Sequence, residues 1–323
     1  FWTELTETLY MCTFHRDDSI MKVYSVGRSA GTVSELLSFG GGGDVGEPIV
    51  DSAEHGAYIY LHYNAYSGNP YSGVRRFDPV AVTWVEVLNY EDDKSSVGYG
   101  GGIAVAADGK LVASDGNNAY RSATGDNGDW DFDFDLTSFG NAFDSFDLCT
   151  NLDDGYIYGA QNDPDDASDP AIIVRTADGT WANSLVEDVT GDGMTSLCNE
   201  YDSTGAGVAM YAQRWSFFNA NPSPEIWRKP AGGGAWAKDW SGPATNTYGG
   251  TYSQGVVFCR GAIFCLVQVF FGGVGIVTLF RRIAAENYRE VKTWTPNYFV
   301  LETNAGAGPM CAAPNNLTKT HEV

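Results

Sequence analysis

The stretch Trp-Arg-Lys-Pro-Ala-Gly-Gly-Gly-Ala-Trp-Ala-Lys-Asp-Trp, residues Trp227–Trp240, decides the fold. A short apolar or aromatic run ends in Arg, a turn of small residues follows, and an aromatic residue opens the next run. Glycine-rich turns between such runs favour a β-hairpin. The same plan recurs at Val74–Leu88, Tyr120–Phe134, Val174–Leu185 and Leu279–Trp294, with a degenerate copy at Val23–Leu37.

A repeated arginine sets the period of this hairpin. Its positions are Arg76, Arg121, Arg175, Arg228 and Arg281. The steps between them are 45, 54, 53 and 53 residues, and a serine stands 51 residues before the first. Periods of this size indicate propellers, solenoids or arrays, and four short strands per unit favour propeller blades.

We therefore predict an all-β fold, a six-bladed β-propeller that forms a single domain over residues 1–323. Five blades are expected at 48–90, 101–136, 144–186, 194–240 and 254–294. The first is expected at 9–37, with its innermost strand supplied by 308–313, because Gly308–Ala313 is similar in sequence to Gly102–Ala107. Strands from both termini would then close the ring and remove its open edges.

The hairpins resemble the Asp-box (BNR) repeats of sialidase-like propellers, whose pattern is Ser-x-Asp-x-Gly-x-Thr-Trp. Thr176–Trp181 keeps the Asp, Gly, Thr and Trp with shorter spacing, and Ser122–Trp130 keeps the Ser, Asp, Gly and Trp with one extra residue. Lys229–Trp236 keeps only a Gly and the final Trp. The resemblance implies a propeller whose motifs are mostly structural, and the Arg-Ile-Pro motif of sialidases is absent from the sequence.

The charge of the chain narrows its partners and its location. A net charge of −22 with 19 Lys and Arg disfavours nucleic acid, which needs clustered cations. The most apolar stretch, Val256–Phe280, is broken by an arginine and several glycines, so we expect no membrane insertion. Six cysteines and a start at Phe1 rather than Met favour an extracellular, cell-surface or virion-surface location after leader removal. Asn316 opens a glycosylation sequon, which agrees with that location.

The cysteines suggest three disulfides. Cys12 with Cys311 would join the two ends of the first blade, Cys259 with Cys265 would cross a hairpin, and Cys149 with Cys198 would join neighbouring inner strands. The alternative is that all six are buried thiols, which are ordinary small apolar residues in tight inner strands.

Two arginines are each followed by an acid on the next strand: Arg76 by Glu86, and Arg281 by Glu290. One interpretation is a sugar pocket between blades, where Arg and Glu bind hydroxyls while an aromatic such as Trp84 or Trp236 stacks on the ring. Six-bladed fungal fucose lectins are similar in architecture. The other interpretation is a cross-strand salt bridge with packing aromatics.

A loop between two strands of the fourth blade is rich in carboxylates. Its acids are Asp163, Asp165, Asp166 and Asp169. Oxygen-rich loops suit calcium, which takes roughly six to eight oxygen ligands. A solvated acidic loop without metal is the alternative.

The function we predict is non-enzymatic recognition or scaffolding, with a glycan or a protein surface as ligand and calcium as the sole cofactor considered. A structural subunit of a filament, appendage or virion, which assembles with itself or a larger extracellular complex, is the first alternative. A secreted glycoside hydrolase or lyase is the second, although no catalytic pair can be chosen among 41 acids from the sequence.

Overall fold

The computed structural model describes residues 2–3, 8–15, 20–26, 32–40, 49–63, 72–94, 101–139, 146–161, 170–186, 192–216, 223–242, 251–259, 261–271 and 274–294. Most of them lie in strands, and the predicted fold class, a six-bladed β-propeller, is confirmed. No helix among these residues is long and apolar enough to span a membrane. The chain divides into two compact units, Phe1–Ser138 with Ala142–Leu148, and Phe139–Asn141 with Cys149–Val323. A single domain over 1–323 stays a prediction.

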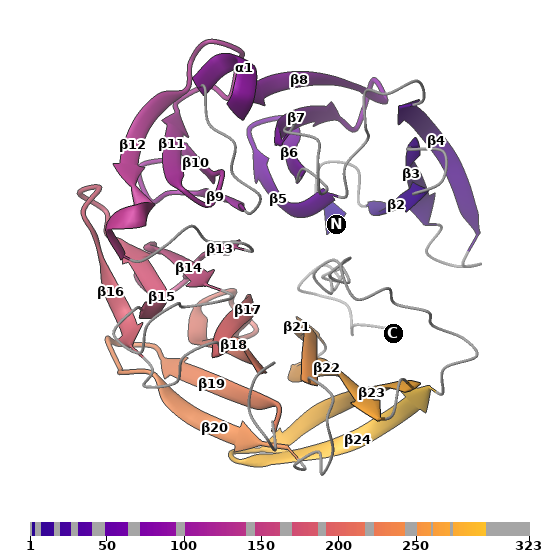
Figure 1. Cartoon of the computed structure of the whole chain (residues 1–323), viewed down its shortest axis with the longest axis vertical. Coiled ribbons are helices and arrows are strands. Elements are labelled where there is room, and N and C mark those ends of the chain that lie inside the picture. The colour runs from indigo at the N-terminus through magenta and orange to yellow at the C-terminus, as the bar shows by residue number, and fades with distance from the viewer. Residues whose placement is uncertain are drawn as a thin grey trace. The chain divides into compact units, whose positions relative to one another are not determined.

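The first unit contains three antiparallel sheets whose strands pair in chain order (Figure 1). Sheet 1 comprises β1 (Trp2–Thr3), β2 (Thr8–His15), β3 (Ile20–Val26) and β4 (Val33–Gly40). Sheet 2 comprises β5 (Ile49–His55), β6 (Tyr58–Tyr63), β7 (Gly73–Asp78) and β8 (Thr83–Asn89), and helix α1 (Tyr90–Lys94) follows it. Sheet 3 comprises β9 (Ile103–Val105), β10 (Leu111–Ser114), β11 (Asn118–Ser122) and β12 (Asp131–Asp135), followed by a 3-10 turn at Leu136–Phe139.

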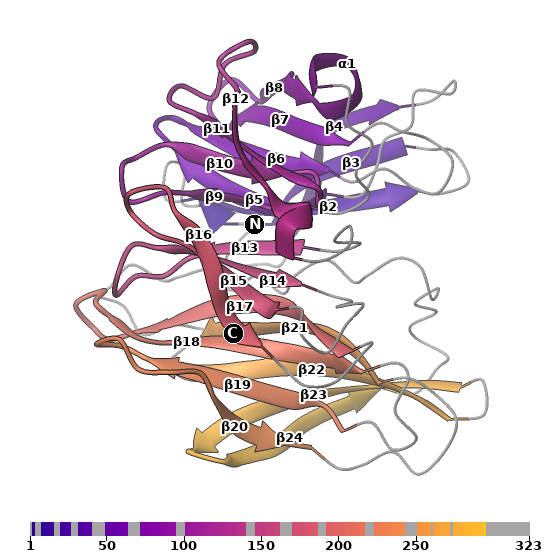
Figure 2. The same cartoon turned by 60° about the vertical axis from the view of Figure 1, so that its left-hand side comes forward.

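The second unit holds the other sheets, apart from residues 146–148 of β13. Sheet 4 comprises β13 (Phe146–Thr150), β14 (Ile157–Gln161), β15 (Pro170–Arg175) and β16 (Trp181–Val186). Sheet 5 comprises β17 (Asp192–Tyr201), β18 (Gly207–Ser216), β19 (Glu225–Pro230) and β20 (Ala237–Ser241). Sheet 6 comprises β21 (Thr251–Cys259), β22 (Ala262–Phe271), β23 (Val274–Ala284) and β24 (Asn287–Trp294). Sheets 5 and 6 are joined where Ser216 pairs with Thr251 (Figure 2).

Strand β1, which is two residues long, is the innermost strand of sheet 1. Trp2 pairs with Leu9, and Thr3 pairs with Thr8. This N-terminal segment lies outside the repeat that the sequence predicts. The segment 308–313, which we predicted for this place, lies outside the described residues.

Helix α1 begins where the last strand of sheet 2 was expected to end. The Asn89 side chain accepts bonds from the backbone N–H groups of Glu91 and Asp92 at 3.1 and 3.2 Å. Asp93 in turn accepts the Asn89 N–H at 2.8 Å. This reciprocal capping satisfies donors that a helix start leaves open, so the chain turns into a helix rather than extending the strand.

Within each unit, neighbouring sheets pack on each other through alternate residues of their strands. The core between sheets 2 and 3 consists of Tyr60, Val74, Val87, Leu88, Tyr90, Ile103, Leu111, Ala113, Tyr120 and Trp130. Trp130, Trp181, Trp236 and Tyr288, which precede or open the outer strands of sheets 3 to 6, are all 9% exposed or less. Trp130, Trp236 and Tyr288 belong to cores between two sheets of one unit, so their recurrence reflects packing rather than repeated ligand contacts.

Candidate functional site

Arg75 and Arg76 point to opposite faces of β7. The turn before β8 closes with Asp78 opposite Thr83, and this register pairs Arg76 with Val85 and Arg75 with Glu86. Since successive strand residues face opposite sides, Arg76 and Glu86 do not share a face. Our expectation that they lie across from each other is wrong by one residue.

The residues that do meet on this face are Tyr63, Arg75, Trp84 and Glu86, which we call the Arg75–Glu86 cluster. The Arg75 guanidinium lies 3.4 Å from Glu86 Oε2, and the Tyr63 hydroxyl donates to the same oxygen at 2.7 Å. The guanidinium also stands 4.9 Å from the Tyr63 ring centroid and 5.2 Å from that of Trp84. Arginine, carboxylate and two aromatic rings therefore converge at one place on sheet 2.

Burial decides how this cluster is held. Tyr63 is 4% exposed, and burial raises the pKa of its hydroxyl, with a further contribution from the negative charge of Glu86. The hydroxyl therefore stays protonated and fixes Glu86. The side chains of Arg75 and Glu86 keep 25% and 41% of their area exposed. Both bonds to Glu86 use Oε2, and within the described residues Oε1 has no protein partner.

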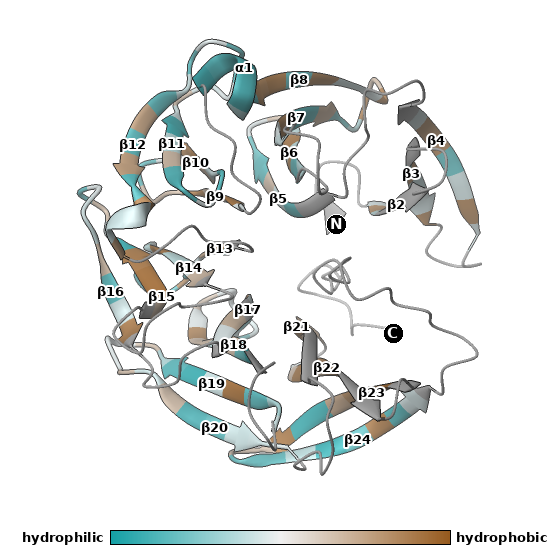
Figure 3. Ribbon diagram, in the orientation of Figure 1, coloured by the Kyte–Doolittle hydropathy of each residue, from teal (hydrophilic) through white to brown (hydrophobic). Residues whose placement is uncertain are grey.

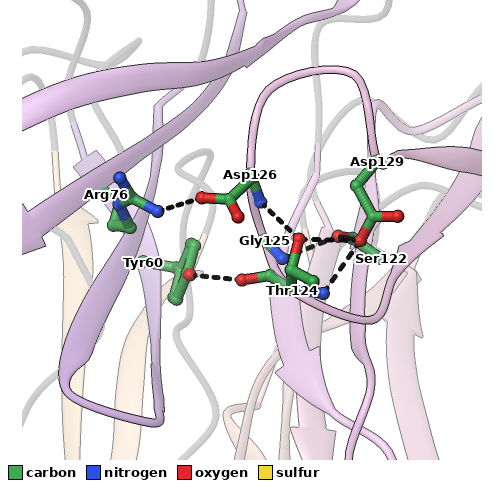
Figure 4. A network of polar contacts seen from close by, with 7 residues as sticks. All are labelled: Tyr60, Arg76, Ser122, Thr124, Gly125, Asp126 and Asp129. Atoms are coloured by element: carbon green, nitrogen blue, oxygen red, sulfur yellow. Dashed lines mark hydrogen bonds and ion pairs between the residues drawn. The ribbon is translucent and has the colours of Figure 1, made fainter.

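Arg76 has a different task, shown in Figure 4. Its guanidinium forms an ion pair with Asp126 in the turn before β12 and lies 4.5 Å from the ring centroid of Tyr58. Beside it, the Tyr60 hydroxyl donates to the Thr124 carbonyl at 3.0 Å. Asp129 holds the same turn by accepting from the Thr124 N–H at 2.9 Å. Arg76 therefore ties sheet 2 to sheet 3, which agrees with the structural interpretation of the repeated arginine.

The second predicted pair is also displaced by one residue. Arg281 lies opposite Arg289, and Glu290 lies opposite Phe280. The expectation that Arg281 and Glu290 share a face is therefore wrong. At the place that Arg75 takes in sheet 2, sheet 6 has Phe280, so the cluster is not repeated there.

Sheet 5 does not repeat the cluster either. Trp236 is 9% exposed and donates its indole N–H to the Ser184 hydroxyl of sheet 4 at 3.0 Å, as a packing residue does. Trp227 stands opposite Lys238, whose ammonium lies 2.6 Å from Glu225.

Glu225 also receives Arg214 at 2.9 Å and the Trp227 indole N–H at 3.1 Å. Burial acts to raise the pKa of Glu225, but the bonds from Lys238 and Arg214 outweigh burial and lower it. This carboxylate is therefore ionised and fully engaged, and it offers nothing to a ligand.

Two of the three predicted disulfides are corrected by the structure, because Cys149, Cys198, Cys259 and Cys265 are thiols. In the hairpin, Cys259 pairs with Ala262 and Cys265 with Val256, so the two sulfurs are not opposed. The Cys149 sulfur accepts the side-chain N–H of Asn199 on β17 at 3.3 Å. Cys198 directly precedes Asn199, so its side chain faces the opposite side, towards the core between sheets 5 and 6. The side chain of Cys12 and all of Cys311 lie outside the description.

The acidic loop and the sequon are not described. Asp163, Asp165, Asp166, Asp169 and Asn316 all lie outside the described residues, so calcium binding and glycosylation stay predictions. Within the described ranges, no group of three or more His, Cys, Asp or Glu residues is placed to hold a metal ion.

A partly buried carboxylate in the first unit was not anticipated. Asp51 accepts the N–H groups of Ile103 at 2.7 Å and Ser52 at 2.7 Å, and it also receives the Leu148 N–H. Burial, together with the charge of Asp147, raises the pKa of Asp51 well above its usual value. One side chain of β5 thereby connects the inner strands β9 and β13.

His62 lies opposite Asp51 across β5 and β6. It is fully buried, with Nε2 at 2.8 Å from the Ser114 carbonyl and 3.1 Å from the Tyr90 hydroxyl. Burial lowers the pKa of His62 to about 4, although the Ser114 carbonyl acts in the other direction. The histidine is therefore neutral at physiological pH.

Comparison with known proteins supports the fold and no particular activity. No protein-family model matches the sequence, and no curated protein sequence matches it significantly. A Bacteroides fragilis protein assigned as a 6-phosphogluconolactonase is similar in structure, with a TM-score of 0.53 and 14% identity over 91% of this chain and 83% of that chain. A chain of a nidogen/laminin complex is similar with a TM-score of 0.50 and 10% identity over 90% of this chain and 94% of that chain. At such identities the likeness shows the fold alone, and the Asp-box assignment stays a prediction.

Sequence reasoning missed Arg75 and Tyr63. The doublet Arg75-Arg76 was a usable signal, because two adjacent arginines in one strand must face opposite sides and only one can follow the repeat. Tyr63 gave no such signal, since its role depends on the pairing of β6 with β7.

Proposed function

We propose that this protein is a non-enzymatic recognition propeller that binds a glycan at the Arg75–Glu86 cluster. The observation that carries the proposal is the convergence of a partly exposed guanidinium, a fixed carboxylate and the Trp84 ring on one face of sheet 2. The other sheets place different residues at the equivalent positions, as Phe280 and Trp227 show.

The chemistry of these groups suits sugar hydroxyls. A carboxylate oxygen accepts from a hydroxyl, and a guanidinium donates several N–H groups in a fixed plane. Glu86 and Arg75 supply these two functions side by side. The indole of Trp84 adds an apolar surface on which the C–H face of a sugar ring can pack.

Binding is favoured over hydrolysis by the number of carboxyl groups in the cluster. Glycosidases of either common type need two carboxyl groups at a set separation. The Arg75–Glu86 cluster has one, and Glu86 accepts from Tyr63 and stands beside Arg75. A single carboxylate beside an arginine is an arrangement for holding hydroxyls.

Glycan-array binding tests the proposal directly. We expect the wild-type protein to bind a set of saccharides, and Arg75→Gln and Glu86→Gln each to weaken that binding at least about tenfold, as loss of a charged hydrogen bond does. Arg121→Gln is the matched control, because Arg121 is an exposed arginine of sheet 3, where it pairs with Asp133 of the same sheet. Equal binding by the wild type and Arg75→Gln would sink the proposal.

The proposed role includes a location outside the cell or on a cell or virion surface. The acidic composition and the sequon support this location. Secretion of the full-length precursor, followed by detection of a glycan on Asn316 by mass spectrometry, would test it. An unglycosylated intracellular product in a eukaryotic host would contradict it.

A further inference from the structure

The turn between β11 and β12 contains the single Asn-Gly pair of the sequence, Asn127-Gly128. The Asp129 N–H closes this turn by donating to the Asp126 carbonyl at 3.1 Å, which places the pair at the two central positions. Gly128 has a φ of 85°, a left-handed conformation that glycine adopts without strain. Both residues of the pair are exposed, and the strand that follows, β12, alternates hydrophilic and hydrophobic residues (Figure 3).

The backbone on the N-terminal side of the pair is firmly held, as Figure 4 shows. The Ser122 hydroxyl accepts the Gly125 N–H at 2.7 Å, and the Thr124 hydroxyl accepts the Asp126 N–H at 3.1 Å. Asp129 accepts the Thr124 N–H at 2.9 Å from the other end of the turn. All of these residues belong to sheet 3 and its turn, so groups of the first unit alone hold both ends.

The pair itself has no such bonds. Within the described residues, no group is bonded to the Asn127 side chain or to the Gly128 N–H. A Cβ added at Gly128 would meet no atom within 4 Å, so the space around this nitrogen is open. An unrestrained carboxamide therefore stands one residue before an unshielded backbone nitrogen. Groups held this close in one chain react far faster than the same groups in separate molecules.

We propose that Asn127 is a site of spontaneous deamidation that yields aspartate and isoaspartate. The backbone nitrogen of Gly128 attacks Cγ of Asn127 and forms a C–N bond, while the bond from Cγ to the side-chain nitrogen breaks. That nitrogen takes up the proton that the backbone nitrogen loses and leaves as ammonia. Water then opens the cyclic imide: attack at Cγ gives aspartate, and attack at the main-chain carbonyl carbon gives isoaspartate. Water is the sole co-reactant, and nothing is oxidised or reduced.

Deamidation at this place changes the charge beside a contact between sheets 2 and 3. Asp126, which directly precedes Asn127, forms the ion pair with Arg76. The same turn accepts the Tyr60 hydroxyl at the Thr124 carbonyl at 3.0 Å. Either product puts a further carboxylate next to Asp126, and isoaspartate also lengthens the main chain inside the turn. The modification therefore acts on the turn that ties the two sheets together.

Mass spectrometry of peptides from the folded, full-length protein after prolonged incubation at pH 8 tests this site. We expect the peptide that contains Asn127 to gain the mass of an amide-to-acid conversion and to elute as two products. The isoaspartate product should accept a methyl group from S-adenosylmethionine in the presence of an isoaspartyl methyltransferase. Asn287 is the internal control: it is exposed as well, but it precedes the bulky and buried Tyr288 and should stay an amide.

Two glycine variants separate the chemistry from the backbone conformation. Gly128→Ala should slow the reaction at Asn127 at least about tenfold, because a side chain crowds the attacking nitrogen. Gly109→Ala is the matched control, since Gly109 also has a positive φ, of 78°, and open space around it but follows an aspartate in the β9–β10 turn. It should leave the rate at Asn127 unchanged, and circular dichroism will show that both variants fold.

Three results would overturn the proposal. Deamidation of Asn127 in 6 M guanidinium chloride but not in the folded protein would mean that the turn protects the pair. Equal rates in the wild type and Gly128→Ala would exclude attack by the backbone nitrogen. Aspartate as the sole product, with no methyl acceptor formed, would mean direct hydrolysis of the side chain rather than passage through the imide.

Discussion

Arg282 on β23 and Asp239 on β20 form a bidentate ion pair between sheets 6 and 5. The guanidinium Nε lies 2.7 Å from Oδ2, and Nη2 lies 3.0 Å from Oδ1. The Tyr288 hydroxyl donates to Oδ2 as well, at 3.1 Å. Asp239 is 7% exposed, so this carboxylate is buried with all its partners in place.

Loss of that carboxylate is expected to destabilise the second unit strongly. Asp239→Leu leaves the partly buried Arg282 charge without its partner, and breaking a buried pair from one side costs about 3–5 kcal/mol. Urea unfolding followed by tryptophan fluorescence measures the change. Asp131→Leu, at an exposed position of β12, is the control. If Asp239→Leu lowered the free energy of unfolding by less than about 1 kcal/mol, the pair would not be structural.

The exposed pair Arg76–Asp126 is expected to contribute much less. The two side chains are 23% and 59% exposed, so water screens the charges. A double-mutant cycle with Arg76→Gln and Asp126→Asn should give a coupling energy below about 1 kcal/mol that declines further in 1 M salt. A coupling well above that value, unchanged by salt, would mean that the clamp in Figure 4 is held by more than exposed electrostatics.

The repeat in the sequence was sufficient for the fold. Arginine spacing and turn chemistry predicted the sheets because a period-two strand with Gly and Asp turns has few other solutions. Side-chain partners were not predictable to the same degree. Arg76 and Glu86 were paired by counting residues, but the turn that closes at Asp78 and Thr83 sets a register one residue away. A shift of one residue exchanges the two faces of a strand.

The cysteines show the same limit. Their places in inner strands were inferred from the repeat, yet the disulfides depended on which face each sulfur takes. Cys149 and Cys198 lie on adjacent inner strands, but they join different cores. Residues that act through tertiary contacts, such as Tyr63 and Asp51, leave no periodic mark in the sequence.

Cys265 is expected to be unreactive in the native protein. It is fully buried, and burial raises the pKa of its thiol, so little thiolate forms at neutral pH. Mass spectrometry after iodoacetamide treatment at pH 8 should show Cys265 unmodified in native protein and modified in 6 M guanidinium chloride. Rapid native labelling of Cys265, or a native disulfide to Cys259, would contradict the packing of β22.

Ionisation of the Asp51 carboxyl group is expected to make the protein less stable as pH rises. Its folded-state pKa lies above the unfolded value of 3.8, so the folded form binds the proton more tightly. The stabilisation from this tighter proton binding is fully present below pH 3.8 and is lost as pH rises through the folded pKa. Asp51→Asn cannot ionise, and its carbonyl can still accept N–H bonds. We therefore expect Asp51→Asn to be more stable than the wild type at pH 7.

Urea unfolding at pH 3 and pH 7 checks this sign. The advantage of Asp51→Asn should vanish at pH 3, where the wild-type carboxyl is protonated in both states. Asp131→Asn, an exposed aspartate on β12, is the control and should show no such crossover. A variant less stable than the wild type at pH 7 would mean that Asp51 works as an ionised acceptor.

His62 is expected to act in the opposite direction on the acid side. The folded-state pKa of His62 is about 4, against 6.5 when unfolded, so the unfolded chain binds the proton first as pH falls. Its contribution is complete above pH 6.5 and is lost between 6.5 and 4, by about 3 kcal/mol in total. His62→Gln keeps a side-chain N–H for the Ser114 carbonyl and cannot titrate. The difference in unfolding free energy between wild type and His62→Gln should therefore grow by about 3 kcal/mol from pH 4 to pH 7.

His55→Gln, at a partly exposed histidine on β5, is the control. If the difference between wild type and His62→Gln stayed constant with pH, His62 would be accessible to protons in the native state.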